Sequence, residues 1–236
     1  VLPSTAYLRL WLPEYFANQY SRILYLDYDT VTQSSDINAL FTVDLGDHAL
    51  AGVLYKLQWH HADKPVHDFW HLNIDCTKYL NTGVLLIDCA KWQGQDLTRT
   101  ILDVSHTLQN PHFHDQSLVN VALQGAWAEL SPVWNWQIAA NFPRLTQQYS
   151  PKILHFAGRQ KPWLLGQSPS MLPRNYIDAY QVFFQANDLP QQFSIDPQTL
   201  TPPLRNRLRA TFKHIKASAR IRRLMARYPD PLTTLI

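Results

Sequence analysis

Three segments of the chain consist of nearly continuous apolar residues bounded by polar or turn-forming positions. They are residues 22–26 (RILYL), 49–55 (ALAGVLY) and 79–89 (YLNTGVLLIDC). Runs of this length predict β-strands, and the third is typical of a strand that is covered on both faces. A shorter run, residues 152–158 (KILHFAG), predicts a last strand that leads into a turn.

Between these strands the apolar positions recur at helical spacing. Residues 4–20, 91–107 and 114–125 predict helices, the first beginning at a Ser/Thr cap and the third ending at Gly125. Strands that alternate with helices predict an α/β sheet domain, in which ligands bind beyond the carboxyl ends of the strands. The polar residues found at such ends are Asp27, Asp29, Asn81 and His155.

The last part of the chain has a different composition. Residues 189–203 are rich in Pro and Gln and predict a linker. Residues 204–236 predict a basic amphipathic helical tail, because residues 205–236 hold 9 of the 21 Lys and Arg residues but 1 of the 18 Asp and Glu residues. We therefore expect three parts: a domain at 1–188, the linker, and the tail. One face of the tail helix carries Leu204, Leu208, Phe212, Ile215 and Ala219.

The overall composition narrows the class of protein. With 236 residues, 46% of them hydrophobic, the chain is large enough to bury a core. We find no apolar run long enough for a membrane-spanning helix and no leader with a cleavage site, so neither is expected. Two cysteines, Cys76 and Cys89, make no disulfide framework, and a reducing cytoplasm is the expected compartment.

Asp27 and Asp29 follow the first predicted strand with one residue between them. In extended backbone, alternate side chains point the same way, so both carboxylates would face one point. Close carboxylates repel each other unless a cation lies between them, and a hard divalent ion shared with a phosphate suits that position. An ordinary acidic turn after a strand is the alternative interpretation.

Four motifs in this order resemble those of the family-8 retaining glycosyltransferases, which are nucleotide-sugar enzymes with the GT-A fold. The motifs are YLDYD, NTGVLLID, HDQSL and HFAGRQKPW, and the resemblance runs from about Thr5 to Trp163. Within the family, the chain resembles bacterial enzymes that transfer galactose or glucose to lipopolysaccharide and lipooligosaccharide. The resemblance implies a mixed sheet flanked by helices, with UDP-galactose or UDP-glucose as donor and a glycolipid or oligosaccharide as acceptor.

The resemblance also assigns roles to individual residues. It implies a metal site of Asp27, Asp29 and His155, with Mn²⁺ as the cofactor and Mg²⁺ as an alternative. The residues that it assigns to donor binding are Arg9, Asp27, Tyr28, Asn81, Gly158 and Lys161. The types suit the role, because glycine lets a phosphate approach the backbone and lysine adds positive charge.

Asp115 and Gln116 are the catalytic residues that the resemblance implies beside the donor sugar. Gln116 matches the position of an expected nucleophile, but an amide is a poor nucleophile and a covalent double displacement normally needs a carboxylate. We therefore expect a front-face retaining transfer. For Asp115, a role as the N-cap of the following helix is an alternative to contact with the sugar.

Two departures from the family pattern matter. The family has further residues before the position that matches Thr5, including the first strands and much of the base pocket. We therefore expect a GT-A domain without its first strands, either as a piece of a longer protein or with an incomplete donor site. In addition, Tyr55 stands where some relatives have an aspartate near the sugar, which leaves the sugar open.

Residues 59–71 (WHHADKPVHDFWH) are unusually rich in histidine. The four histidines are His60, His61, His67 and His71. They permit a zinc site, but we favour a flexible loop over the active site that contributes contacts to the acceptor. The aromatic residues Trp59, Phe69 and Trp70 either stack on sugar rings or pack against the domain.

The basic tail has three interpretations. A nucleic-acid-binding element is not favoured, because the tail lacks groove-reading or stacking modules. A solvated helix would usually mix acids with its bases. An interfacial helix on anionic lipid fits the apolar stripe and its Arg and Lys flanks, and predicts peripheral contact with the inner face of the plasma membrane through residues 204–228.

The sequence thus favours an Mn²⁺-dependent retaining glycosyltransferase that builds a bacterial surface glycan. A non-catalytic nucleotide-sugar-binding module with an incomplete donor site is the alternative from another class. A metal phosphohydrolase is disfavoured, because we find no second cluster of carboxylates and histidines of the kind that two-metal sites use.

Overall fold

The computed structural model describes residues 4–61, 64, 66–108, 111–139, 142–158, 161, 182–188 and 204–236. The predicted linker, residues 189–203, lies outside the described residues, so the division of the chain into three parts stays a prediction.

The main sheet has five strands in the order β1-β4-β3-β5-β7. Their bounds are β1 (Arg22–Leu26), β3 (Leu50–Leu54), β4 (Leu80–Asp88), β5 (Ala128–Leu130) and β7 (Thr234–Leu235). β3 and β5 are parallel, whereas β4 is antiparallel to both β1 and β3, and β7 is antiparallel to β5. The predicted α/β fold with a mixed sheet is confirmed.

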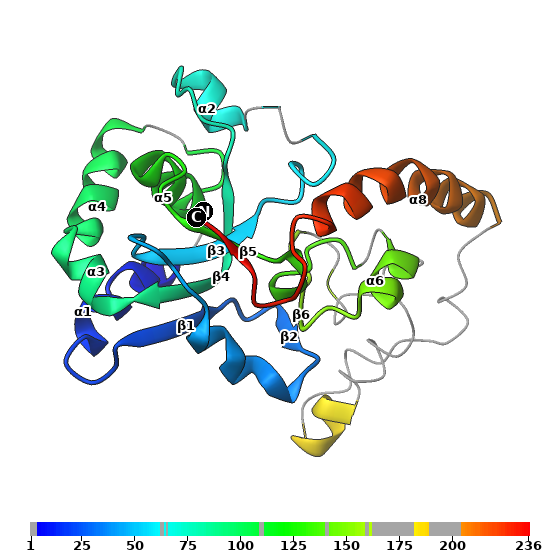
Figure 1. Ribbon diagram of the computed structural model, residues 1–236, viewed down its shortest axis with the longest axis horizontal. Coiled ribbons are helices and arrows are strands. Elements are labelled where there is room, and N and C mark those ends of the chain that lie inside the picture. Colours follow the sequence, from blue (N-terminus) through cyan, green and yellow to red (C-terminus); the bar gives the residue numbers. More distant parts are fainter. Residues whose placement is uncertain are drawn as a thin grey trace.

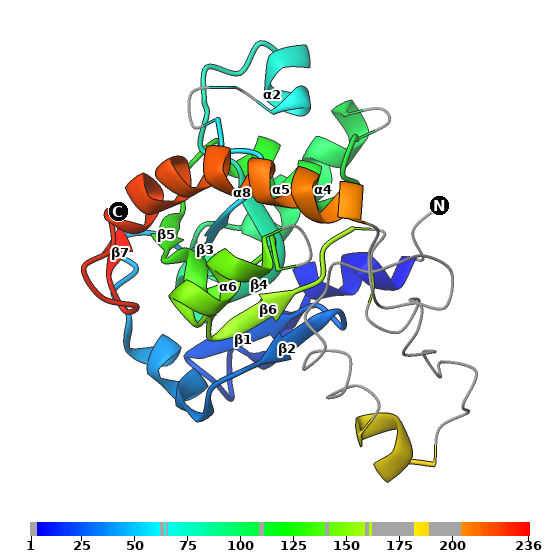
Figure 2. The same cartoon turned by 90° about the vertical axis from the view of Figure 1, so that its right-hand side faces the viewer.

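A second sheet brings the ends of two distant segments together. It consists of β2 (Thr30–Thr32) and β6 (Ile153–His155), in a register that pairs Thr30 with His155 (Figure 2). The Phe156 N–H then donates to the Asp29 carbonyl over 3.0 Å. This small sheet therefore places the HFAG motif beside the two aspartates that follow β1.

Helices cover the main sheet on both sides. In Figure 1, α3, α4 and α5 lie to the left of the sheet, and α6 and α8 lie to its right. The α-helices are α1 (Leu12–Phe16), α2 (His67–His71), α3 (Cys89–Gly94), α4 (Leu97–Thr107), α5 (Asp115–Leu123), α6 (Pro143–Tyr149) and α8 (Leu204–Met225). The 3-10 segments are η1 (Ser4–Leu10), η2 (Ser35–Thr42) and η3 (Pro132–Trp134).

Two helices predicted as continuous are each divided. The segment 4–20 begins as the 3-10 segment η1 and continues as the short α1. The segment 91–107 is divided between α3 and α4 at Asp96, whose φ of 48° lies in the left-handed region. A residue in that conformation cannot continue a right-handed helix, so the chain turns there.

The two halves of the α8 segment have different surroundings. Leu204, Leu208, Phe212 and Ile215 are 68%, 53%, 67% and 63% exposed, whereas Ala217, Ile221, Leu224 and Tyr228 are buried in the main core. The apolar stripe of the sequence changes faces because the second half packs on the domain. None of the helices in the described part of the chain is long and apolar enough to cross a membrane.

Candidate functional site

The candidate site lies beyond one end of the strands of the main sheet. β1, β3 and β5 have their carboxyl ends there, and β4 begins there because it runs antiparallel to both β1 and β3. Asp27 follows β1, Asn81 lies at the start of β4, and Asn135 follows β5 through η3. His155, at the end of β6, joins them from the second sheet.

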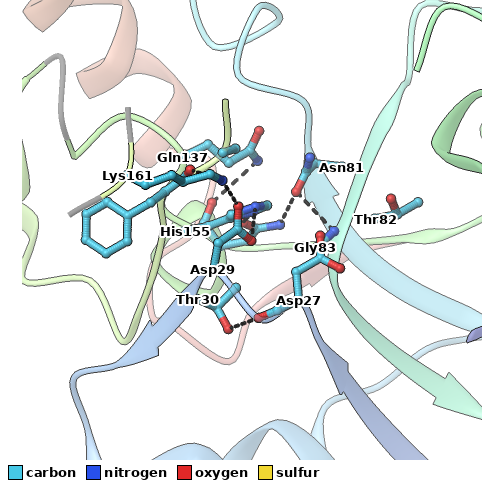
Figure 3. A network of polar contacts seen from close by, with 12 residues as sticks. Asp27, Asp29, Thr30, Asn81, Thr82, Gly83, Gln137, His155 and Lys161 are labelled. Atoms are coloured by element: carbon cyan, nitrogen blue, oxygen red, sulfur yellow. Dashed lines mark hydrogen bonds and ion pairs between the residues drawn. The ribbon is translucent and has the colours of Figure 1, made fainter. Parts of the chain in front are cut away.

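Asp27 and Asp29 lie in a turn rather than in the extended strand assumed from the sequence. The Thr30 N–H and Thr30 Oγ1 both donate to the Asp27 carbonyl, over 3.1 and 2.7 Å. The carboxylates nevertheless converge, because ligand atoms of Asp27, Asp29 and His155 all lie within 4.8 Å of one another (Figure 3). In the part of the chain that the structure describes, no other group of His, Cys, Asp or Glu side chains meets this criterion.

The electrostatics of Asp29 suit a cation site. Burial alone would raise the pKa of its carboxyl, but His155 and Lys161 reverse the effect and lower the pKa well below its ordinary value. The buried Oδ1 of Asp29 accepts no hydrogen bond, although Nε2 of His155 lies 3.2 Å away. Two carboxylates with one imidazole, and one buried oxygen left without a hydrogen bond, fit Mn²⁺.

A chain of side-chain amides fixes the tautomer of His155. The Thr82 N–H donates to Oε1 of Gln116, so the Asn81 amide must also donate to that oxygen, over 2.8 Å. Oδ1 of Asn81 then accepts from the Asn135 amide over 2.8 Å, which turns Oδ1 of Asn135 toward Nδ1 of His155 at 2.9 Å.

Because an amide oxygen can only accept, His155 carries its proton on Nδ1. Its Nε2 is therefore the nitrogen that faces Asp29, and it is the atom that would bind a metal once it carries no proton. The Gly83 N–H, which donates to Oδ1 of Asn81 over 3.2 Å, fixes the same orientation of that amide independently. The orientation of the imidazole thus follows from two backbone N–H groups at the start of β4.

Gly83 also makes room for the imidazole. A Cβ at this position would lie 2.2 Å from Cε1 and 2.6 Å from Nδ1 of His155. These distances are far below van der Waals contact, and His155 is 3% exposed and cannot swing into solvent. The glycine of the NTG motif is therefore required sterically.

Arg9 joins two of the predicted site residues. Its guanidinium lies 3.1 Å from Asp27 Oδ1 and 3.1 Å from Asp115 Oδ2, and it stacks over the ring of Tyr25 at 4.4 Å. Burial raises the pKa of the Asp115 carboxyl, and Arg9 opposes that rise. The capping alternative for Asp115 is not supported, because the helix begins at Asp115 itself with His114 as its N-cap.

Two lysines approach the aspartates from the segments after β3 and β6. The Lys161 ammonium contacts Asp29 and donates to the Phe156 carbonyl over 2.8 Å. The Lys56 ammonium donates to the Ala157 carbonyl over 3.0 Å, and burial together with Lys161 lowers its pKa. Gly158, with φ of 108°, turns the chain between these contacts in a conformation that favours glycine.

The remaining predicted site residues differ in exposure. Asn81, predicted to bind the donor, and Gln116, predicted to be catalytic, are buried at the inner end of the site, with exposed fractions of 6% and 7%. Tyr28 is 86% exposed, with Lys161 Nζ 5.9 Å from the centre of its ring. The structure thus brings the predicted site residues to one region, and their roles in binding and catalysis stay predictions.

The zinc interpretation of residues 59–71 is not supported. His67 stacks with His71 at 5.9 Å and with His112 at 4.7 Å, whereas His60 and His61 line a separate cavity beside α8. The aromatic residues are divided as well. Trp59 and Phe69 are buried, with exposed fractions of 2% and 0%, whereas Trp70 is 68% exposed.

Sequence reasoning missed four residues of the site. They are Lys56, Gly83, Asn135 and Gln137. The side-chain amide of Gln137 connects the Lys56 N–H with the Leu54 carbonyl. Gly83 had a signal, as a glycine inside a strand. Asn135 and Gln137 lie in a segment rich in tryptophan, VWNWQ, and their buried amides carry no spacing that a single sequence reveals.

Comparison with known proteins agrees with this geometry. The family model "Glycosyl transferase family 8" matches residues 2–165. General stress protein A of Bacillus subtilis (strain 168) is 28% identical over 180 residues, which are 69% of this chain and 60% of that protein. Lipopolysaccharide glucosyltransferase WaaO of Escherichia coli (strain K12) is 27% identical over 176 residues, 69% of this chain and 51% of that protein. The chain thus spans only part of the length of both relatives.

Solved structures agree in fold. The galactosyltransferase LgtC, in complex with donor and acceptor sugar analogs, superposes with a TM-score of 0.53 at 22% identity, over 87% of this chain and 71% of that chain. The apo-form of glycosyltransferase GlyE from Streptococcus pneumoniae TIGR4 gives a TM-score of 0.55 at 22% identity, over 80% of this chain and 48% of that chain. These likenesses show the GT-A fold.

Proposed function

The chain belongs to glycosyl transferase family 8, and on that premise we propose that it transfers galactose or glucose from the UDP-sugar to a lipopolysaccharide or other surface glycan, with retention and with Mn²⁺. The observation that carries the proposal is the convergence of Asp27, Asp29 and His155 within 4.8 Å. The likeness to a lipopolysaccharide glucosyltransferase supports an acceptor of that kind.

In this proposal the leaving diphosphate lies beside Asp27, Asp29 and His155, which would hold the metal. Bound Mn²⁺ would offset negative charge on the departing UDP. Lys161 and Lys56 add positive charge at the same place, and the turn at Gly158 lets the diphosphate approach the backbone. A lowered pKa still leaves Lys56 able to donate hydrogen bonds to phosphate oxygens.

The inner end of the site supports a front-face transfer. Oε1 of Gln116 already accepts hydrogen bonds from Asn81 and Thr82, so it is not available to attack a sugar carbon. The acceptor hydroxyl would instead attack from the side of the diphosphate. The bond from its oxygen to the anomeric carbon forms as the bond to the diphosphate breaks, and its proton passes to the departing phosphate oxygen. Asp115, held by Arg9, faces the sugar as a hydrogen-bond partner.

The first half of α8 supports peripheral membrane contact on the cytoplasmic side. Its exposed apolar residues Leu204, Leu208, Phe212 and Ile215 form one stripe, and the exposed bases Arg205, Arg209, Lys213 and Lys216 lie on the adjoining face. The buried side of the helix faces the domain, so both stripes face outward. A helix of this type lies along an anionic surface with its apolar side inserted.

Calorimetric titration of UDP with and without Mn²⁺ tests the proposal, with Asp29→Asn as the variant and Asp103→Asn as the control. Asp103 is an exposed aspartate of α4 and is not part of the cluster. We expect Mn²⁺-dependent binding that Asp29→Asn loses and Asp103→Asn keeps. Binding without turnover of UDP-galactose or UDP-glucose on any glycan would favour the non-catalytic module. Absence of Mn²⁺-dependent binding to the folded chain would refute the proposal.

A further inference from the structure

A cavity of about 590 Å³ lies between the second half of α8 and the segment that follows β3, and none of the residues assigned to the donor site lines it. We call it the α8 cavity. Its charged walls are Lys64 on one side and Arg220, Arg223 and Arg227 on the other. Arg220 and Arg223 lie one helical turn apart, so their side chains share a face of α8.

The α8 cavity carries an excess of positive charge. Arg227 forms a two-pronged ion pair with the carboxylate of Glu129 over 2.9 and 3.0 Å, which offsets its charge. For Lys64, Arg220 and Arg223, by contrast, the described residues provide no carboxylate partner. Three like charges around one cavity repel each other, and an anion between them removes that repulsion.

The floor of the α8 cavity is apolar and held in place. Leu54, Trp59 and Leu224 line it and are 7%, 2% and 8% exposed. The indole N–H of Trp59 donates to the Leu54 carbonyl over 2.8 Å, and Oε1 of Gln58 accepts from the Tyr79 N–H over 2.9 Å. An apolar floor with guanidinium groups at the rim suits a sugar ring that bears a phosphate, since guanidinium recognises phosphate with paired donors.

The α8 cavity and the metal cluster share one wall. The carbonyl of Leu54, a residue that lines the cavity, accepts from the Gln137 amide over 3.0 Å, and Gln137 accepts from the Lys56 N–H over 2.9 Å. The Lys56 side chain then reaches the Ala157 carbonyl, which follows His155 in the chain. The cavity and the candidate site are thus linked through Leu54, Gln137 and Lys56, and the proposal takes the acceptor glycan to lie across both.

From this geometry we propose that the α8 cavity binds a phosphate group on the acceptor glycan, through Lys64, Arg220 and Arg223. The proposal rests on the proposed function, because it concerns the acceptor of that reaction. It predicts that the enzyme prefers acceptors with a phosphomonoester over their unphosphorylated forms. The phosphomonoester would lie on a sugar near the acceptor sugar that receives the new residue.

The test is calorimetric titration of glucose 6-phosphate, and of glucose as its neutral counterpart, into the chain in metal-free buffer without phosphate. We expect saturable binding of glucose 6-phosphate and none of glucose. Arg220→Glu with Arg223→Glu should weaken binding at least tenfold, and the milder pair of Gln substitutions should weaken it as well. Binding should persist in Asp29→Asn, so the result is independent of the metal cluster and of transferase activity.

A matched control distinguishes binding in the α8 cavity from a general effect of net charge on α8. Arg205→Glu with Arg209→Glu changes the net charge equally on the exposed first half of α8. We expect this control to keep glucose 6-phosphate binding and to lose binding to phosphatidylglycerol vesicles, and the Arg220/Arg223 pair to show the opposite pattern. The proposal is overturned if glucose 6-phosphate binds no better than glucose, if both pairs weaken it equally, or if the cavity pair affects only vesicles.

Discussion

Asn135 offers the sharpest test of how the candidate metal site is oriented. Its Oδ1 accepts a hydrogen bond from Nδ1 of His155 over 2.9 Å, and its amide donates to Oδ1 of Asn81 over 2.8 Å. Asn135→Leu removes both hydrogen bonds and keeps the number and branching of the side-chain heavy atoms. Asn135→Asp keeps an acceptor for His155 and removes the donor to Asn81. The two variants therefore separate orientation of the ligand from stability of the fold.

The expected magnitudes follow from which partners remain. In Asn135→Leu the buried Nδ1–H of His155 loses its acceptor, which costs about 1–3 kcal/mol in unfolding free energy. Asn81 keeps the Gly83 N–H on the same oxygen, so its loss is nearer to about 1 kcal/mol. A group that orients a metal-binding histidine is worth about 10–100-fold in metal affinity. We expect that loss for Leu, and Mn²⁺ affinity close to that of the unchanged chain for Asp.

The assay is titration of Mn²⁺ followed by the paramagnetic resonance signal of the free ion, which needs neither donor nor turnover. Thr146→Val serves as the control, because it removes a buried hydrogen bond from Trp136 Nε1 at 2.8 Å without facing the cluster. It should lower the urea midpoint but leave Mn²⁺ affinity unchanged. Undiminished Mn²⁺ binding by Asn135→Leu, or an equal loss in Asn135→Asp, would show that the amide chain does not orient the ligand.

Three further outcomes test other features. Gly83→Ala should lower Mn²⁺ affinity more than tenfold and lower the free energy of unfolding by about 1–3 kcal/mol through overpacking. Gly52→Ala, whose Cβ would lie 3.5 Å from its nearest atom, should bind Mn²⁺ normally. Similar behaviour of the two variants would contradict the steric argument. Burial, with His61 and Arg220, lowers the pKa of His60 below its ordinary 6.5, so the folded state loses stability as pH falls through that lowered pKa. The urea midpoint should therefore drop less between about pH 7.5 and 5.5 in His60→Gln, and equal drops would count against a neutral His60. Leu208→Ser with Phe212→Ser should reduce sedimentation with phosphatidylglycerol vesicles and leave UDP binding intact; unchanged sedimentation would argue against insertion of the stripe.

The longer strands of the main sheet were predictable from the sequence because each coincides with an apolar run. β1, β3 and β4 lie within the predicted segments, and β6 lies within the shorter fourth one. β5 and β7 were missed because they are only three and two residues long. β5 also contains Glu129, a charge that becomes compatible with burial only when Arg227 and Tyr228 contact it.

The residues of the candidate site were predictable where they belong to a known sequence motif. Residues that join the site only through the folding of distant segments were not. Asp27, Asp29 and His155 converge as expected, although through a turn and a second sheet that no local pattern indicated. Asn135 depends on three other side chains for its orientation. A single sequence holds no record of such contacts, because each partner is far away along the chain.

The pairing of β2 with β6 has a kinetic consequence. Three residue pairs hold this sheet, whereas β1 and β4 are joined over five. Short ladders open more often than long ones, without unfolding of the whole domain. β2 is only partly buried, whereas β6 lies in the core, so a local opening would move β2 and the preceding Asp29 away from His155 while the main sheet stays folded. A metal held by these three residues would exchange at the rate of that opening, and bound metal would in turn slow amide hydrogen exchange in β2 and β6 but not in β4.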